Sequence, residues 1–312
     1  MKMLIAGAGG LLGRELVRLN LARGDEVRAV VLSRRELDGF EHPQLDIREA
    51  NVTRPKTLRG LCAGMDRVIS CVGITRLNGR VTHEDVDYQG NVHLLQEAVR
   101  SRVGKFGFIS PAGVADDEAD EVPLLAAKQR FETVLQDASI PWVIFRSGGF
   151  FADLADMMKL AARGPLFVIG RGEVRSTPIH VPELAAIMLA DLETAANEII
   201  EVGGPEHLSW LDVCRTCFEV QGRSPRIMKI PAWLCRGTLA LLRPFSFRYY
   251  AMGKLLLFMS TRDVCTPPRG RLRLRAYLES PPAPSPSPAL NLNPHPNPPP
   301  APRPMALHEL AK

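Results

Sequence analysis

The sequence predicts an α/β fold, a doubly wound parallel sheet with a small C-terminal region for a substrate or a partner. Two observations support this class. A short apolar strand at the start of the chain leads into a glycine turn and an amphipathic helix. Strand-like apolar runs then alternate with helical patterns through the first half. The proline-rich end has a composition that cannot build a core, so it lies outside this fold.

The glycine turn is the most informative segment. Gly7, Gly10 and Gly13 are spaced three apart, between an apolar strand over 3–6 and a helix that begins near Leu11. Glycine permits positive φ and a close approach of the backbone to a pyrophosphate, and the helix N-terminus presents free N–H groups to that anion. We therefore expect a nucleotide phosphate at this turn. The contacting residues would be Gly7, Gly9, Gly10, Leu11, Leu12 and Gly13.

The remaining elements follow in alternation. The expected strands cover 27–32, 45–50, 68–72, 106–110 and 142–146, and the expected helices cover about 86–101 and 124–137. Alternation of this kind indicates βαβ units and a Rossmann-like sheet, which binds ligands beyond the carboxyl ends of its strands. We expect an NAD(P)-binding domain over 1–150, a substrate or partner region interleaved with it over 151–279, and a disordered tail over 280–312.

The bulk composition excludes several classes. The net charge is +5, but Lys and Arg are spread along the chain, so we expect no nucleic-acid site. No apolar run is long enough to span a bilayer. Because the first strand begins at Met3, we expect neither a secretory signal nor a transit peptide in this sequence. The six cysteines form no disulfide framework, and Cys214 and Cys217 fit half-buried helix positions better than a metal site. We expect no metal, and a cytoplasmic or organelle matrix or stroma location.

Several sequence blocks together carry a family resemblance over about 1–278. The chain resembles the atypical short-chain dehydrogenases/reductases, the NAD(P)-binding group that includes the NmrA-like proteins. The first block fits that family's G-x-x-G-x-x-G turn, because the dehydrogenase form G-x-G-x-x-G would need glycine at Leu12. The blocks cover 7–13, 70–76, 86–91, 145–151 and 178–181.

The end of the second strand favours NADP(H) over NAD(H). NAD enzymes place an acid there for the ribose hydroxyl, whereas this chain has Ser33, Arg34 and Arg35, with Glu36 following later. Two guanidinium groups suit a 2′-phosphate. Alternatively, both arginines are solvated loop charges. The resemblance adds further cofactor contacts, which are Asn51, Val52, Cys71, Val72, Gly73, Ser110 and Lys128.

The catalytic side of the family pattern is incomplete. Standard members use a tyrosine as proton donor, with a lysine four residues later; Lys128 fits the lysine, but Leu124 occupies the tyrosine position. Asp87 stands where the family often has asparagine. We therefore weigh an oxidoreductase or isomerase that acts on a small apolar substrate with a non-standard proton donor. The alternative is a non-catalytic NADP(H) sensor or an accessory subunit, as in respiratory complex I.

A basic apolar segment over 230–259 leaves three uses open. An amphipathic helix here would cap the substrate pocket, lie on a membrane surface or dock onto a protein partner. Arg76 either binds an anionic substrate or faces water. We interpret Tyr88, His180 and Arg146 as structural first, the last because a guanidinium inside the sheet edge needs a partner.

Overall fold

The computed structural model describes residues 1–74 and 81–280. Arg76 lies outside the described residues, as does the predicted proline-rich tail beyond Ser280.

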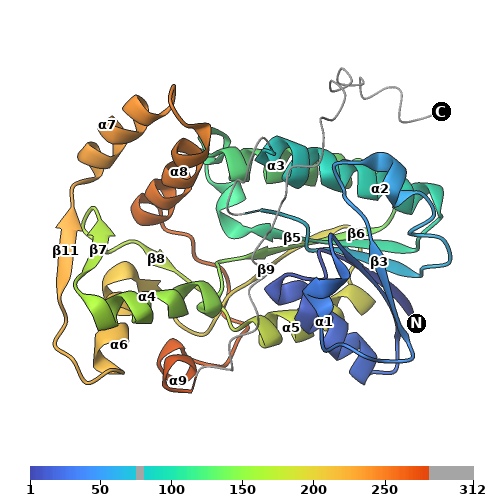
Figure 1. The fold of residues 1–312 in the computed structure, drawn as a ribbon, viewed down its shortest axis with the longest axis horizontal. Coiled ribbons are helices and arrows are strands. Elements are labelled where there is room, and N and C mark those ends of the chain that lie inside the picture. Colours follow the sequence, from blue (N-terminus) through green and yellow to red (C-terminus); the bar gives the residue numbers. More distant parts are fainter. Residues whose placement is uncertain (75–80, 281–312) are drawn as a thin grey trace.

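Seven strands within the described residues form one parallel sheet, which confirms the predicted α/β class (Figure 1). Their order is β3-β2-β1-β4-β5-β6-β9. The order reverses direction beside β1, and ligands of such sheets bind at that point. The strands are β1 (Lys2–Ala6), β2 (Glu26–Val31), β3 (Leu45–Glu49), β4 (Arg67–Ser70), β5 (Lys105–Pro111), β6 (Trp142–Ser147) and β9 (Glu198–Val202).

Helices cover both faces of the sheet, and alternate strand residues feed the two cores. Met3 and Ile5 pack toward the layer of α1 (Leu11–Ala22) and α5 (Val181–Thr194). Leu4 and Ala6 pack toward the layer that contains α2 and α3. Because successive side chains of a strand point to opposite faces, one buried strand contributes to both cores. The second layer consists of α2 (Asn91–Arg100) and α3 (Pro123–Gln136).

Short helical turns make most connections at the carboxyl edge. The expected helix over 86–101 is split: α2 follows a π-helical turn, η3, and the other short turns are 3₁₀-helical. The chain before α2 therefore winds more widely than an α-helix, a feature that is frequent at functional sites. The turns are η1 (Arg34–Leu37), η2 (Pro55–Leu58), η3 (Glu84–Gly90), η4 (Ala112–Ala115) and η5 (Ala119–Glu121).

The C-terminal region has its own core beside the sheet. Its helix α6 begins after Ser209, whose side chain accepts from the Asp212 backbone N–H in a capping box. Cys214 and Cys217 are fully buried on α6, and burial raises their thiol pKa to about 12 and about 11, respectively. The elements are α4 (Phe151–Arg163), β7 (Leu166–Ile169), β8 (Arg175–Ser176), β10 (Leu208–Ser209), α6 (Trp210–Glu219), β11 (Ile227–Ile230) and α9 (Leu274–Glu279).

The chain passes between the two regions more than once. After α4, β7 and β8 it returns to the main sheet with α5 and β9, and β9 pairs with β6. It then re-enters the C-terminal region at β10. The division into 1–150 and 151–279 stays a prediction.

The basic apolar segment forms two helices rather than one. They are α7 (Ala232–Leu242) and α8 (Phe247–Thr261), and Pro244 lies between them. Phe258 of α8 is buried in a small cluster on the connection between β5 and α3, in which Val122 also lies. The pocket-cap role of this segment stays a prediction. In the described part of the chain, no helix is long and apolar enough to cross a bilayer.

Candidate nucleotide-binding site

The glycine turn after β1 has the backbone that its sequence predicts. Gly7 has φ +73°, and a Cβ there would lie 2.8 Å from the Cys71 carbonyl oxygen at the end of β4. A Cβ on Gly13 would lie 2.2 Å from the Gly7 oxygen, so α1 packs directly on the turn. Both positions exclude any larger residue. Gly10 differs, because its φ is −72° and its nearest contact is at 3.4 Å.

The N-terminus of α1 is left open toward this turn. Gly10 is its N-cap and gives no side-chain cap, and the first turn contains no acidic residue. Gly10 and Leu11 are also exposed. Free N–H groups and the helix dipole therefore face outward without an internal partner, and these are the groups that bind a phosphate anion. The turn fits the pyrophosphate of a dinucleotide.

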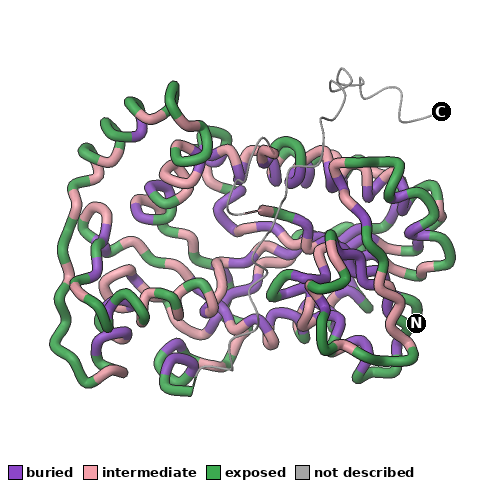
Figure 2. Tube along the Cα trace, in the orientation of Figure 1, coloured by how far each residue is buried: buried purple, intermediate pink, exposed green. Residues whose placement is uncertain are grey.

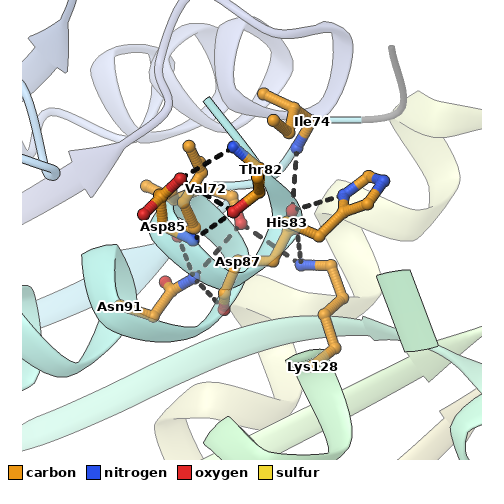
Figure 3. Close-up of polar contacts among 9 residues, drawn as sticks. Val72, Ile74, Thr82, His83, Asp85, Asp87, Asn91 and Lys128 are labelled. Atoms are coloured by element: carbon orange, nitrogen blue, oxygen red, sulfur yellow. Dashed lines mark hydrogen bonds and ion pairs between the residues drawn. The ribbon is translucent and has the colours of Figure 1, made fainter. Parts of the chain in front are cut away.

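A buried charged cluster lies beside the glycine turn, where η3 meets α3 (Figure 3). Asp87 is fully buried, and its carboxylate lies 3.0 Å from His83 Nδ1 and 3.3 Å from Lys128 Nζ. The ammonium also donates to the Val72 carbonyl at 3.2 Å and lies 4.8 Å from the centre of the Phe108 ring. Burying such charges is expensive, so the cluster is held by mutual pairing.

Hydrogen bonds hold the cluster against the end of β4. Asn91 Nδ2 donates to the Asp87 carbonyl at 2.9 Å, and Ser70 at the end of β4 donates to Asn91 Oδ1. A Cβ on Gly73 would lie 2.7 Å from Asp87 Oδ1 and 3.1 Å from Lys128 Nζ. A side chain at 73 would therefore push against the ends of the Asp87 and Lys128 side chains, and the ion pair would have to shift.

Two buried hydroxyls at neighbouring strand ends lack partners among the described residues. They belong to Ser110 of β5 and Ser147 of β6. A buried hydroxyl without a hydrogen bond costs about 1–3 kcal/mol. Their place at the carboxyl edge fits a bound group that supplies the missing partner. Cys71 nearby is no nucleophile, because burial raises its pKa to about 12.

The end of β2 differs from the arrangement expected for a phosphate clamp. Arg34 donates to the Ile47 carbonyl on β3 at 2.8 Å, and Arg35 is exposed. Ser33 and Glu36 form a capping box around η1. The Glu36 carboxylate is thereby turned back onto Gly9, where a Cβ would lie 2.1 Å from its Oε2. Burial raises the pKa of Glu36.

The loop after β3 is ordered by its own side chains. Asn51 Oδ1 accepts from the Thr53 N–H at 2.9 Å and from its hydroxyl at 2.8 Å. Val52 is buried against Gly90, and its carbonyl lies 2.9 Å from His93 Nδ1. In this arrangement Asn51 stabilises its own loop, and its predicted contact with the cofactor stays a prediction.

The tyrosine position has no proton donor. Leu124 is buried one turn before Lys128 on α3. Tyr88 packs under the Arg130 guanidinium, 4.0 Å from ring centre to Cζ. Arg146 pairs with buried Glu132, Nη2 to Oε2 at 2.6 Å, which confirms its structural interpretation.

His180 likewise lies in a packed setting. It precedes α5, and its ring centre lies 5.6 Å from that of Tyr277 on α9. Burial lowers the pKa of His180.

The structure therefore brings the predicted residues to one sheet edge in two groups. Gly7 to Gly13 and Cys71 to Gly73 meet directly, and Lys128 joins them through the Val72 carbonyl. The second group, after β2 and β3, lies at the far side of the turn. Sequence reasoning missed His83 and the position of Glu36. Their signals were the four-residue spacing of His83 and Asp87 and the Ser33–Glu36 capping pair.

This glycine turn, open helix N-terminus and sheet order define a dinucleotide-binding protein of the doubly wound class. A profile of the NAD(P)H-binding family matches residues 7–193. The chain belongs to this family, among the atypical short-chain dehydrogenases/reductases.

Two relatives and one solved structure show what the chain is similar to. The photosystem II assembly factor Ycf39 of Synechocystis is 26% identical over 260 residues, covering 82% of this chain and 78% of that protein. The chloroplastic divinyl chlorophyllide a 8-vinyl-reductase of Zea mays is 30% identical, covering 89% and 78%, respectively. The NADPH-dependent quinone oxidoreductase QOR2 of Escherichia coli shares the fold, with a TM-score of 0.67 at 14% identity, covering 88% of this chain and 98% of that one.

Proposed function

We propose that the chain is an NADP(H)-dependent oxidoreductase that acts on a small apolar substrate with a non-standard proton donor. The observation that carries this proposal is the buried Lys128–Asp87–His83 cluster beside the glycine turn. The cost of removing two charges from water offsets most of the attraction in a buried ion pair, so such a pair adds little net stability. Buried charges also gather at functional sites, and the cluster therefore favours a functional role. The bound nucleotide would supply a hydride. An 8-vinyl-reductase and a quinone oxidoreductase among the similar proteins support this class.

In this proposal Lys128 replaces the missing tyrosine. Its ammonium carries the proton that the substrate would receive after hydride transfer, and Asp87 with His83 holds it in place. Leu124 one turn away is apolar and excludes water from the same side. The unpartnered hydroxyls of Ser110 and Ser147 are the candidates for binding the nicotinamide or the substrate.

The matched test of this role is Lys128→Arg. Arginine keeps the positive charge opposite Asp87 but does not give up its proton near neutral pH. We expect turnover of NADPH with a panel of small apolar alkenes, quinones and carbonyl compounds to fall by at least about a hundredfold. Nucleotide affinity should fall much less than turnover, and thermal melting establishes that the variant is folded. Turnover that survives Lys128→Arg in a folded protein would remove Lys128 as the donor.

We also propose that NADP(H) is the preferred coenzyme, because Arg34 and Arg35 flank the β2 end without an acid before them. The Glu36 carboxylate beside Gly9 argues against this preference, because an acid at this place suits the ribose hydroxyl of NAD(H). The variant Arg34→Glu/Arg35→Glu should weaken NADPH binding by at least about tenfold and NADH binding much less. Calorimetric titration of both nucleotides measures this.

The matched control for that variant is Arg163→Glu/Arg171→Glu, which makes the same charge change at exposed positions in the C-terminal region. It should leave both affinities unchanged. Tighter binding of NADH than of NADPH by the wild-type protein would contradict the proposal. In that case Glu36 would be the acid that accepts from the ribose hydroxyl.

A non-catalytic role is the second candidate, namely a nucleotide-binding accessory or assembly protein. The absence of a tyrosine at Leu124 and the similarity to an assembly factor favour it. It predicts a stable protein partner that is lost when Arg34 and Arg35 become acids, and no NADPH oxidation with the panel above. A monomer with measurable turnover excludes it. The chloroplastic relatives favour a stroma among the predicted locations.

A further inference from the structure

The chain between Glu219 and Asp263 contains no acidic residue. It carries eight cations, and without them the net charge of the whole protein would be −3 instead of +5. The unpaired cations of such a block present a positive field to a partner, whereas those beside Glu118 and Glu121 are neutralised locally. The eight residues are Arg223, Arg226, Lys229, Arg236, Arg243, Arg248, Lys254 and Arg262.

Most of these cations are free to meet an external anion. Lys254 pairs with Glu121, and Arg262 with Glu118. Among the described residues, the exposed Arg236 and Arg248 make no ion pair. The same holds for Arg226, Lys229 and Arg243, which are also exposed.

Large apolar side chains stand exposed in the same segment. Trp233, Leu241 and Phe245 are 71%, 73% and 85% exposed, respectively. Within the described residues of α7, Leu239 alone is buried. Figure 2 shows α7 mostly in the exposed colour at the outer end of the molecule. Trp233 and Leu241 are eight positions apart, so they lie on one face of α7.

That apolar face is directed away from the rest of the protein. A hollow of about 280 Å³ lies between α7, α8 and the connection at Glu118–Val122. Arg236, Leu239 and Arg243 line it, whereas Trp233, Leu241 and Phe245 do not. The two helices pack on each other as a hairpin, and their outer apolar side chains contact no core cluster of the described chain.

A second exposed stripe continues on α8. Tyr249, Leu256 and Met259 are exposed at spacings of seven and three residues, which places them on one helix face. Ala251, Leu257 and Phe258 are buried on the other side. The hairpin therefore combines tryptophan, tyrosine, phenylalanine and leucine with unpaired arginines, the composition of helices that lie in a membrane interface.

We propose that the α7–α8 hairpin docks this protein on the surface of a bilayer that contains anionic lipid. Trp233, Leu241 and Phe245 would enter the boundary between headgroups and acyl chains. The exposed cations that lie outside the hollow, Arg226, Lys229 and Arg248, would pair with lipid phosphates. A fluid lipid surface fits side chains that project from a protruding hairpin, since it needs no matching concave shape. The proposal is independent of the coenzyme and of any turnover.

The test is co-sedimentation of the full chain with vesicles. We expect binding to phosphatidylcholine vesicles that contain phosphatidylglycerol, at least about tenfold weaker binding to phosphatidylcholine alone, and release by added salt. The triple variant Trp233→Ser/Leu241→Ser/Phe245→Ser should lose at least about tenfold in affinity. The matched control Leu160→Ser changes a residue of similar exposure on α4 and should bind normally.

Tryptophan fluorescence locates the contact. Of the three tryptophans, Trp142 is buried and Trp210 half-buried, so Trp233 should dominate quenching by brominated lipid. Trp233→Phe should still sediment but lose that quenching. No binding to either vesicle at low salt overturns the proposal, and so does undiminished binding of the folded triple variant. A protein partner is the alternative in that case, and its binding would then depend on the same three residues without lipid.

Discussion

Replacing Asp87 by alanine should destabilise the protein by about 3–5 kcal/mol, because it leaves the Lys128 ammonium buried without its counter-charge. Lys128 is 7% exposed, and within 1–74 and 81–280 its remaining hydrogen-bond partner would be the Val72 carbonyl. His83 would also lose its Nδ1 partner. Urea unfolding followed by circular dichroism measures the change.

Two further variants separate charge from packing at this position. Asp87→Asn keeps the size and one acceptor, so it should cost less than Asp87→Ala. Combining Asp87→Asn with Lys128→Met removes both charges, and the pair should be more stable than the sum of the single variants predicts. Additive effects of the two single variants would show that the cluster is not energetically coupled.

The control for this series is an ion pair on the surface. Asp156 and Lys159 of α4 lie 2.6 Å apart, and both side chains are mostly exposed. Asp156→Ala should therefore change stability by less than about 1 kcal/mol. A similar loss for Asp156→Ala and Asp87→Ala would contradict the importance assigned to burial.

The fold was predictable because its signals are local. Alternating apolar runs predicted six of the seven sheet strands within one or two residues, but not β9, and the Ser209–Asp212 pair marked the start of α6. Pro244 was an available signal that the basic segment forms two helices, since proline does not continue a helix.

The side-chain pairings of the site were less predictable, because they join distant elements. Lys128 meets Asp87 across 41 positions of sequence, and the packing of α3 on η3 alone determines that contact. The family pattern identified both positions but not their ion pair. After β2, the capping box of η1 turns the Glu36 side chain toward Gly9. The Arg34 guanidinium donates instead to the Ile47 carbonyl on β3. The order of charged residues in the sequence does not predict which way these side chains point.

Gly13→Ala should weaken both nucleotide binding and the fold. Its Cβ would lie 2.2 Å from the Gly7 oxygen and 2.7 Å from Ala8 Cα, and both are backbone atoms that cannot move alone. Overpacking of this kind costs about 1–3 kcal/mol, and the shift of α1 displaces the N–H groups that face the phosphate. We expect thermal melting to fall and NADPH affinity to drop by at least about tenfold.

Gly10→Ala separates an effect on nucleotide binding from an effect on the stability of the fold. Gly10 has φ −72° and its nearest neighbour would lie at 3.4 Å, so alanine fits the free protein without strain. Melting should stay near wild type while NADPH affinity falls, because a methyl group at the exposed turn obstructs the pyrophosphate. Gly237→Ala on α7 is the control, because a Cβ there meets open space. It should leave the nucleotide affinity unchanged. If Gly10→Ala binds NADPH as well as wild type, the pyrophosphate does not lie over this turn. Gly13 would then be explained by helix packing alone.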